Sequence, residues 1–332
     1  MTRLRRVARA ALSISRVRKG RGFVLVDAAG QSLRQPELRQ RVAALGIPPA
    51  WTEVRIAAEP DAHIQACGVD AAGRLQYVYH AEWTRRRIRK QQKQLRLLAE
   101  ALPRLRRRVV EGLGAETGSR ELALAIAVAL IDRTAMRIGR ERYLEINGTR
   151  GAGTLYRRDV TVAGNAVCIA FPAKSGKRAR YCLTDARLAE ALSRILTLPG
   201  KRLLVVRRDD GGWRNLRTGE INAFLREVAG VEVTAKDFRT LHASALAGEA
   251  LARLEPAESD RVRRRQMAEV TRRVAAFLQN TPAVCRTSYI TPCLFRLFDR
   301  GRLARLWQGE GESRRGLRQR EARLAAVLAA PG

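Results

Sequence analysis

Several side chains in the second half of the chain are of the kinds that metal-free cleavage of a phosphodiester would need. Such cleavage requires a side-chain nucleophile, fixed cations for the non-bridging oxygens and a proton donor for the leaving sugar oxygen. Tyr289 is a tyrosine flanked by polar residues just past a predicted helix end. Lys236 and Arg239 lie three residues apart on one face of a starting helix. Arg137 ends a predicted buried helix, and residues 174–177 form a predicted hairpin tip with a lysine at each end.

Each of these patterns is weak when taken alone. A tyrosine near a helix end is more often core or surface filler, and an arginine in so basic a chain is usually a solvated charge. The sequence contains no P-loop, GxGxxG or HExxH motif, so it gives no support to nucleotide-driven or zincin chemistry. No group of carboxylates resembles the two-metal site that phosphodiester hydrolysis usually requires.

The charge of the chain points to nucleic acid as the partner. Its 332 residues include 64 Lys+Arg and 32 Asp+Glu, which gives a formal net charge of +32. A folded chain with such an excess of base attracts polyanions, and an acidic membrane surface is a distant second choice. Arginine far outnumbers lysine. This bias suits bidentate phosphate binding, although an arginine-rich composition by itself would produce the same ratio.

The sequence also predicts a chain that stays in the cytoplasm. The longest apolar run, residues 122–131, is about half of the roughly 20 residues that a membrane span needs, and no apolar signal core follows the basic N-terminus. The five cysteines show no CxxC spacing. We therefore expect neither a disulfide scaffold nor a zinc module, and a reduced protein.

The spacing of apolar residues divides the chain near residue 83. Residues 1–82 carry short extended segments bounded by turns, which predicts a small β-rich domain. Residues 83–332 are predicted to be mainly helical, with a three-stranded β-meander inserted between residues 160 and 183. The fold class is therefore α+β. The predicted helices span residues 83–110, 121–137, 185–196, 218–228, 236–254, 261–278 and 291–307.

Taken together and in order, these segments resemble the type IB DNA topoisomerases of the short bacterial and poxvirus kind, over nearly the whole chain. The most specific signals are Ile47-Pro48-Pro49-Ala50-Trp51 and Gln76-Tyr77-Val78-Tyr79-His80 in the first domain. In the second domain, the matching segments are residues 132–139, 174–176, 236–240 and 280–290. The resemblance implies a β-rich domain and a mainly helical catalytic domain that clamp duplex DNA between them.

The resemblance also implies a role for individual residues. Tyr289 would be the nucleophile, and Arg137 and Arg239 would bind the non-bridging phosphate oxygens. Asn280 would donate a hydrogen bond to the same phosphate, and Lys174 would be the general acid. Further DNA contacts would come from Tyr77, Tyr79, His80, Lys177 and Lys236. The reaction would need no ATP, metal ion or other cofactor. The partner would be double-stranded DNA, and we expect a monomer associated with the nucleoid.

The sequence departs from the family pattern in places, none of which removes a catalytic group. After His80 the chain reads Ala81-Glu82-Trp83, where relatives usually have proline before the tryptophan. Leu241-His242 and Gln279 also stand where other residues are usual, and we expect His242 to pack near the site.

Two alternatives remain open. One is a strand transferase related to the tyrosine recombinases, although these usually carry His at the position of Lys236 and lack the first domain. The other is a non-catalytic basic DNA-binding protein that keeps the fold.

Overall fold

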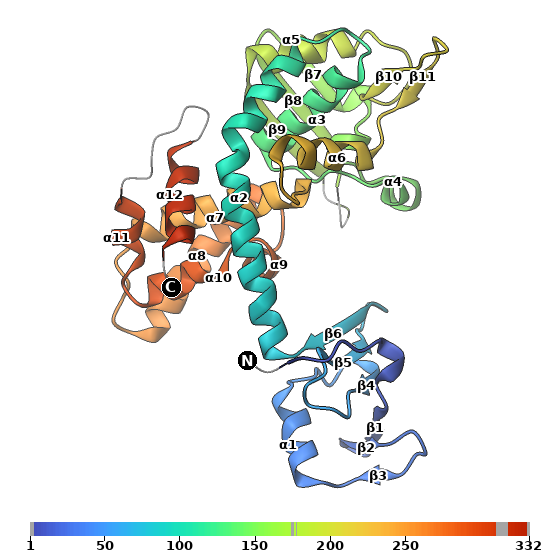
Figure 1. Ribbon diagram of the computed structural model, residues 1–332, viewed down its shortest axis with the longest axis vertical. Helices are drawn as coiled ribbons and strands as arrows, with labels where there is room; N and C mark the ends of the chain where they lie inside the picture. Colours follow the sequence, from blue (N-terminus) through green and yellow to red (C-terminus); the bar gives the residue numbers. More distant parts are fainter. Residues whose placement is uncertain (1–2, 174–175, 177, 310–317, 331–332) are drawn as a thin grey trace. The chain divides into compact units, whose positions relative to one another are not determined.

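The computed structural model describes residues 3–173, 176, 178–309 and 318–330. The chain divides into two compact units, Met1–Lys90 and Gln91–Gly332, and each is described by itself (Figure 1). Strands dominate the first unit and helices the second, which confirms the predicted α+β class. No helix among the described residues is both long and apolar enough to pass through a lipid bilayer.

The N-terminal unit is built on one antiparallel sheet of six strands in the order β3-β2-β1-β4-β5-β6. Apolar side chains of the central strands, such as Ile14, Val54 and Ile56, are buried, as alternation predicts. The first strand and the helix were not anticipated. The elements are β1 (Ile14–Lys19), β2 (Gly22–Val26), β3 (Ser32–Leu33), α1 (Pro36–Ala44), β4 (Thr52–Ile56), β5 (Ile64–Val69) and β6 (Leu75–Tyr79).

The C-terminal unit packs helices around one large hydrophobic core. It begins within α2 (Ala81–Leu113), the long helix in which the division between the units falls. The other helices are α3 (Arg120–Thr134), α4 (Glu141–Asn147), α5 (Ala186–Ile195), α6 (Thr218–Ala229), α7 (Ala235–Ala252), α8 (Asp260–Leu278), α9 (Pro282–Ser288), α10 (Pro292–Asp299), α11 (Leu303–Gln308) and α12 (Gln319–Ala329).

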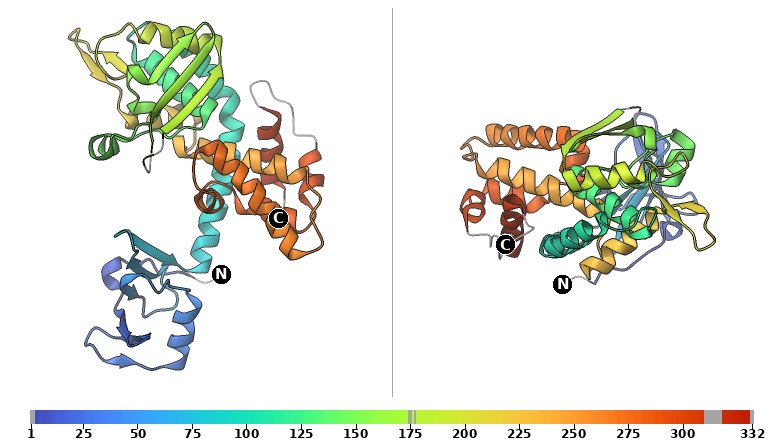
Figure 2. Two further views of the ribbon diagram at one scale, coloured as in Figure 1. Left: turned by 180° about the vertical axis from the view of Figure 1, so that it is seen from behind. Right: turned by 90° about the horizontal axis from the view of Figure 1, so that it is seen from above.

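The predicted meander is an antiparallel sheet of β7 (Val160–Ala163), β8 (Ala166–Pro172) and β9 (Arg178–Thr184), whose strands lie side by side (Figure 2). The expectation that all five cysteines are reduced was wrong. Cys168 and Cys182 face each other directly in the β8–β9 register and form a disulfide. The residue spacing in the sequence did not reveal this pair because the strand register brings the two side chains together. The other three cysteines are free.

Two helix predictions also need correction. The buried helix α3 ends at Thr134 rather than at residue 137, because Ala135 takes a left-handed conformation at φ 52°. The single helix predicted over residues 291–307 is two helices, α10 and α11, with Gly301 at φ 67° between them. A left-handed residue ends the regular hydrogen bonding of a helix. A strand pair, β10 (Val205–Arg207) and β11 (Trp213–Asn215), was not anticipated.

A buried network of charges ties four helices of this unit together. Arg106 on α2 pairs with Asp132 on α3 and with Glu321 on α12, each at 2.8 Å. His242 on α7 lies between the two carboxylates, with its Nε2 3.4 Å from Asp132 and its Nδ1 3.7 Å from Glu321. His242 is therefore a buried member of this network, three residues after Arg239 on α7.

Candidate active site

Arg137 lies in the extended segment that follows α3. Its carbonyl oxygen accepts a hydrogen bond of 2.9 Å from the Ala152 backbone, where two chain segments cross closely. Gly151 makes this crossing possible, because a Cβ at that position would collide with the Arg137 carbonyl oxygen and with Gly139. Burial lowers the pKa of the Arg137 guanidinium, and the nearby positive charge of Arg239 lowers it further. The fold thus keeps the Arg137 guanidinium charged at a cost in free energy, and an anion between the two arginines would offset that cost.

Arg239 is a fully buried arginine in the first part of α7, with only 2% of its surface exposed. Its Nη1 donates a hydrogen bond to the Ala135 carbonyl, and its Nη2 donates to the Leu278 carbonyl at 3.0 Å. Its Nε has no hydrogen-bond partner within the described part of the chain. Two carbonyls therefore fix the guanidinium plane, and the Nε–H remains available to a ligand.

Tyr289 caps the C-terminal end of α9. Its carbonyl oxygen accepts a hydrogen bond of 3.2 Å from the hydroxyl of Ser244 on α7, and its backbone N–H donates to Cys285 at 3.1 Å. The Arg239 guanidinium carbon lies 5.0 Å from the centre of the Tyr289 ring. The folded chain therefore brings together the predicted nucleophile, Tyr289, and Arg239, which is predicted to bind the phosphate. The two residues come from different helices.

Asn280 lies in the connection between α8 and α9, directly after the left-handed residue Gln279 (φ 50°). Its Oδ1 accepts a hydrogen bond of 3.0 Å from the Thr281 backbone, which orients the amide. Its Nδ2 is buried and has no partner among the residues that the structure describes. Because an unpaired buried donor costs free energy, this group marks a place where a ligand oxygen would fit.

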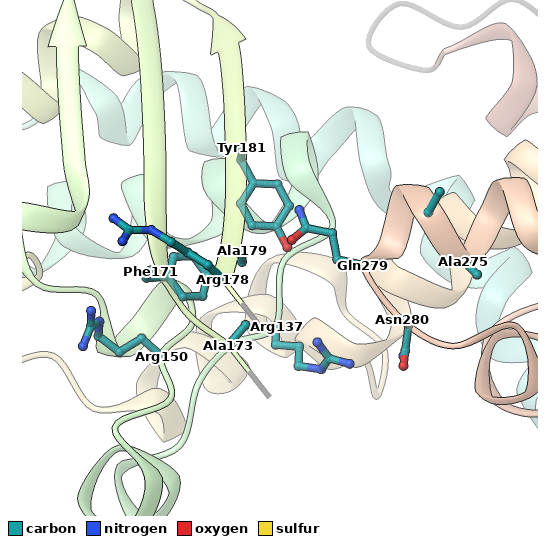
Figure 3. A pocket seen from close by; sticks show the side chains of 11 residues that line it. Arg137, Arg150, Phe171, Ala173, Arg178, Ala179, Tyr181, Ala275, Gln279 and Asn280 are labelled. Atoms are coloured by element: carbon teal, nitrogen blue, oxygen red, sulfur yellow. The ribbon is translucent and has the colours of Figure 1, made fainter. Parts of the chain in front are cut away.

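Two cavities meet at Arg137. The larger one, of about 670 Å³, is lined by Arg137, Arg239 and Tyr289, and by the exposed Lys236 at its edge. The smaller one, of about 290 Å³, reaches Asn280. In Figure 3 the guanidinium of Arg137 points toward the side on which Asn280 lies. Four of the five predicted catalytic residues therefore line these two cavities in the C-terminal unit, and Arg137 lines both.

Sequence reasoning missed three residues that line these cavities. Arg150 borders both, while Tyr181 on β9 and Gln279 border the smaller one. Tyr181 lies on the last strand of the predicted meander, but nothing in the local sequence pattern indicates that this strand lies near the arginines. Lys174 and Lys177, the predicted general acid and its neighbour, lie outside the described residues.

The remaining predicted DNA contacts belong to the N-terminal unit. Tyr77 and Tyr79 lie two residues apart on β6, with ring centres 5.9 Å apart, and His80 follows them. Arg87 lies over the Tyr79 ring at 5.3 Å. These aromatic rings line a hollow of about 750 Å³ whose cations are Arg6, Arg9, Arg86, Arg87 and Lys90. Stacked aromatic rings among cations are typical of nucleic-acid-binding surfaces.

The only group of metal-ligand type found among the described residues is Asp132, His242 and Glu321. It does not fit a metal ion well, because the Arg106 guanidinium already binds both carboxylates. Burial raises the pKa of the Asp132 carboxyl, but the facing His242 ring and Arg106 outweigh it and hold that pKa below its usual range. The cluster is thus an internal ion network rather than a metal centre.

Comparison with known proteins assigns the family. Residues 83–291 match the family described as eukaryotic DNA topoisomerase I, catalytic core. Residues 22–70 match the bacterial DNA topoisomerase IB, N-terminal domain. The chain is also 27% identical to DNA topoisomerase 1B of Acanthamoeba polyphaga mimivirus over 266 residues, which are 78% of this chain and 79% of that protein. The chain therefore belongs to the type IB DNA topoisomerases, and it is an isomerase whose partner is DNA.

Proposed function

We propose that this protein relaxes supercoiled duplex DNA, without ATP or a metal ion, by transient cleavage of one strand. The Tyr289 phenol oxygen forms a bond to phosphorus as the bond from phosphorus to the 5′-oxygen breaks. The phenol loses its proton, and the departing 5′-oxygen gains one. The product is a 3′-phosphotyrosyl link and a free 5′-hydroxyl strand. This link conserves the energy of the broken bond, so attack by the 5′-hydroxyl restores the strand without ATP.

One observation carries this proposal: the Tyr289 ring lies against a buried guanidinium, that of Arg239, which has a donor to spare. Arg137 lines the same cavity as these two residues, and it also lines the smaller cavity that Asn280, with its unpaired Nδ2, borders. Fixed donors of this kind stabilise the charge that develops on the non-bridging oxygens without having to reorganise. The two guanidiniums thereby do what a metal ion would do in other phosphodiester cleavage sites.

Lys174 is the proposed general acid. The described residues around its hairpin, Ala173 and Gly176, line the larger cavity together with Arg137 and Tyr289. An ammonium near this point would protonate the 5′-oxygen as it leaves. Asn280 would hold a non-bridging oxygen, and Lys177 and Lys236 would contact flanking phosphates.

The proposed organisation is a clamp of two domains, residues 1–82 and 83–332, which hold duplex DNA as a monomer. Tyr77, Tyr79 and His80 would contact DNA from the first domain, where aromatic rings and cations gather. Most contacts would go to phosphate and would carry little sequence information. While the strand is cut, the duplex would turn about its intact strand, which releases supercoils of either sign. Such an enzyme would be found on the nucleoid.

Plasmid relaxation in the presence of EDTA and without ATP tests the proposal. We expect the wild-type chain to relax the plasmid and Tyr289→Phe to be inactive while still binding DNA. Tyr156→Phe is a matched control, because Tyr156 lines neither cavity and phenylalanine keeps the ring that packs under Arg150 and Arg158. Equal relaxation by the wild type and Tyr289→Phe would overturn the proposed nucleophile.

A further inference from the structure

We propose that Tyr181 is a further catalytic residue, whose hydroxyl donates a hydrogen bond to a non-bridging oxygen of the phosphodiester that Arg137 and Arg239 hold. This inference rests on the proposed function and adds a donor from the sheet to those from the helices. Nothing in the sequence pattern singled out this tyrosine.

The position of the Tyr181 ring is fixed by its strand. Ala179, Tyr181 and Leu183 alternate along β9, and Ala179 is buried against the core. The Tyr181 ring stacks on Phe171 of the neighbouring strand, with ring centres 6.1 Å apart and an angle of 27° between the planes. Because Phe171 is itself only 2% exposed, the stack leaves the Tyr181 ring little freedom. The hydroxyl is therefore held in one place by regular structure.

That place is the smaller cavity, at the side where the predicted phosphate ligands lie. Tyr181 lines it together with Arg137, Gln279 and Asn280. Figure 3 shows the Tyr181 ring extending from its strand toward Gln279, with Arg137 below it and Asn280 beyond. The side chains come from β9, from the segment after α3 and from the α8–α9 connection, so three parts of the fold converge on this hollow.

The hydroxyl also faces Arg239. Burial raises the pKa of the Tyr181 phenol, while the charges of Arg239 and Arg137 and a hydrogen-bonding contact with Arg239 oppose that rise. A guanidinium can only donate, so the phenol oxygen is the acceptor toward Arg239. Its hydrogen then remains for another acceptor. Arg239 thus lies between two tyrosines, with its guanidinium over the ring of Tyr289 and toward the hydroxyl of Tyr181.

Unused donors around these two cavities point to an anion. Arg239 Nε and Asn280 Nδ2 are buried without partners in the described part of the chain. Adding the Tyr181 hydroxyl gives donors from β9, α7 and the α8–α9 connection around the two cavities that share Arg137. A phosphodiester has two non-bridging oxygens with several lone pairs, which can accept all of these hydrogen bonds. If the ring served only to fill space, phenylalanine would serve equally well.

The variant Tyr181→Phe tests this inference because it removes only the hydroxyl and keeps the stacked ring. The assay is single-turnover formation of the protein–DNA adduct, on a duplex oligonucleotide that carries a cleavage site mapped on plasmid DNA. We expect the rate to fall about 10- to 100-fold, since the lost donor serves a developing charge, while DNA affinity stays within about two-fold. Tyr156→Phe is the control and should cleave at the wild-type rate.

A phosphorothioate at the cleavage site separates a direct contact from a structural effect. Sulfur accepts hydrogen bonds more weakly than oxygen, so one of the two diastereomers should reduce the rate ratio between wild type and Tyr181→Phe toward one. An unchanged ratio with both diastereomers would overturn the direct contact. A wild-type rate in Tyr181→Phe would overturn it as well.

These outcomes are distinct from failure of the proposed function. If the wild-type chain forms no adduct at Tyr289, the proposed function itself fails. If it does form that adduct and Tyr181→Phe is as fast, only the role of Tyr181 fails. An adduct on Tyr181 in the Tyr289→Phe variant would show it to be a nucleophile and would also overturn its role as a donor.

Discussion

The buried ion network at Asp132 gives a sharp prediction for stability. The Asp132 side chain is 7% exposed, and Arg106 binds it through two hydrogen bonds of 2.8 and 2.9 Å. Removing one partner of a buried pair costs about 3–5 kcal/mol, because the other charge stays buried. In Asp132→Asn, Arg106 keeps Glu321 as its second carboxylate partner. We therefore expect a loss at the lower end of that range, about 3 kcal/mol.

The same network predicts how stability depends on pH. The pKa of Asp132 is depressed in the folded chain, and so is that of Glu321, where burial is outweighed mainly by Arg106. A carboxyl with a depressed pKa contributes stability that is complete above its unfolded pKa, about 4, and is lost as the pH falls toward its folded value. Wild-type stability should therefore fall steeply below about pH 4, and the difference between wild type and Asp132→Asn should shrink there.

Urea unfolding followed by far-ultraviolet circular dichroism measures both effects, since the helical unit dominates that signal. Asp210→Asn is the control, because the Asp210 side chain is 68% exposed and lies 4.0 Å from Arg208; it should change the free energy of unfolding by less than about 0.5 kcal/mol. A loss below about 1 kcal/mol in Asp132→Asn, or a loss that does not vary with pH, would refute the reasoning.

Three further predictions concern the site. Arg239→Ala should lower the relaxation rate at least about 100-fold with DNA affinity nearly unchanged, measured by relaxation and filter binding; a rate within a few-fold of wild type would contradict its role. Gly151→Ala should lower both stability and activity, since its Cβ would collide with the Arg137 carbonyl oxygen, and a thermal melt identical to wild type would disprove the close crossing. Lys174→Ala should slow adduct formation while leaving binding nearly intact, whereas lost binding would make Lys174 a phosphate clamp instead.

Local patterns in the sequence were enough to predict much of the architecture. Alternating apolar residues predicted β7, β8 and β9, and the change of period near residue 83 predicted helices after strands. The helix predicted over residues 261–278 is α8. These features depend on neighbours within a few residues, so a sequence pattern is sufficient to reveal them.

Local sequence patterns did not predict contacts between residues that are far apart in the sequence. The pair Arg106 and Glu321 joins residues 215 positions apart, and the disulfide depends on the register of β8 and β9. Tyr181 was expected on the correct strand, but its interaction with Arg239 joins residues 58 positions apart. The break between α10 and α11 depends on Gly301, which has a left-handed conformation. The spacing of apolar residues gives no sign of this conformation.

Identification of the amino acid joined to DNA tests the central claim most directly. The wild-type chain is denatured during reaction with duplex DNA, the DNA is digested with nuclease, and the remaining peptide is sequenced by mass spectrometry. The account predicts a nucleotide attached through its 3′-phosphate to Tyr289, in the peptide that follows Arg286, and a free 5′-hydroxyl on the other strand end. Absence of any adduct, or attachment at another side chain, would contradict it.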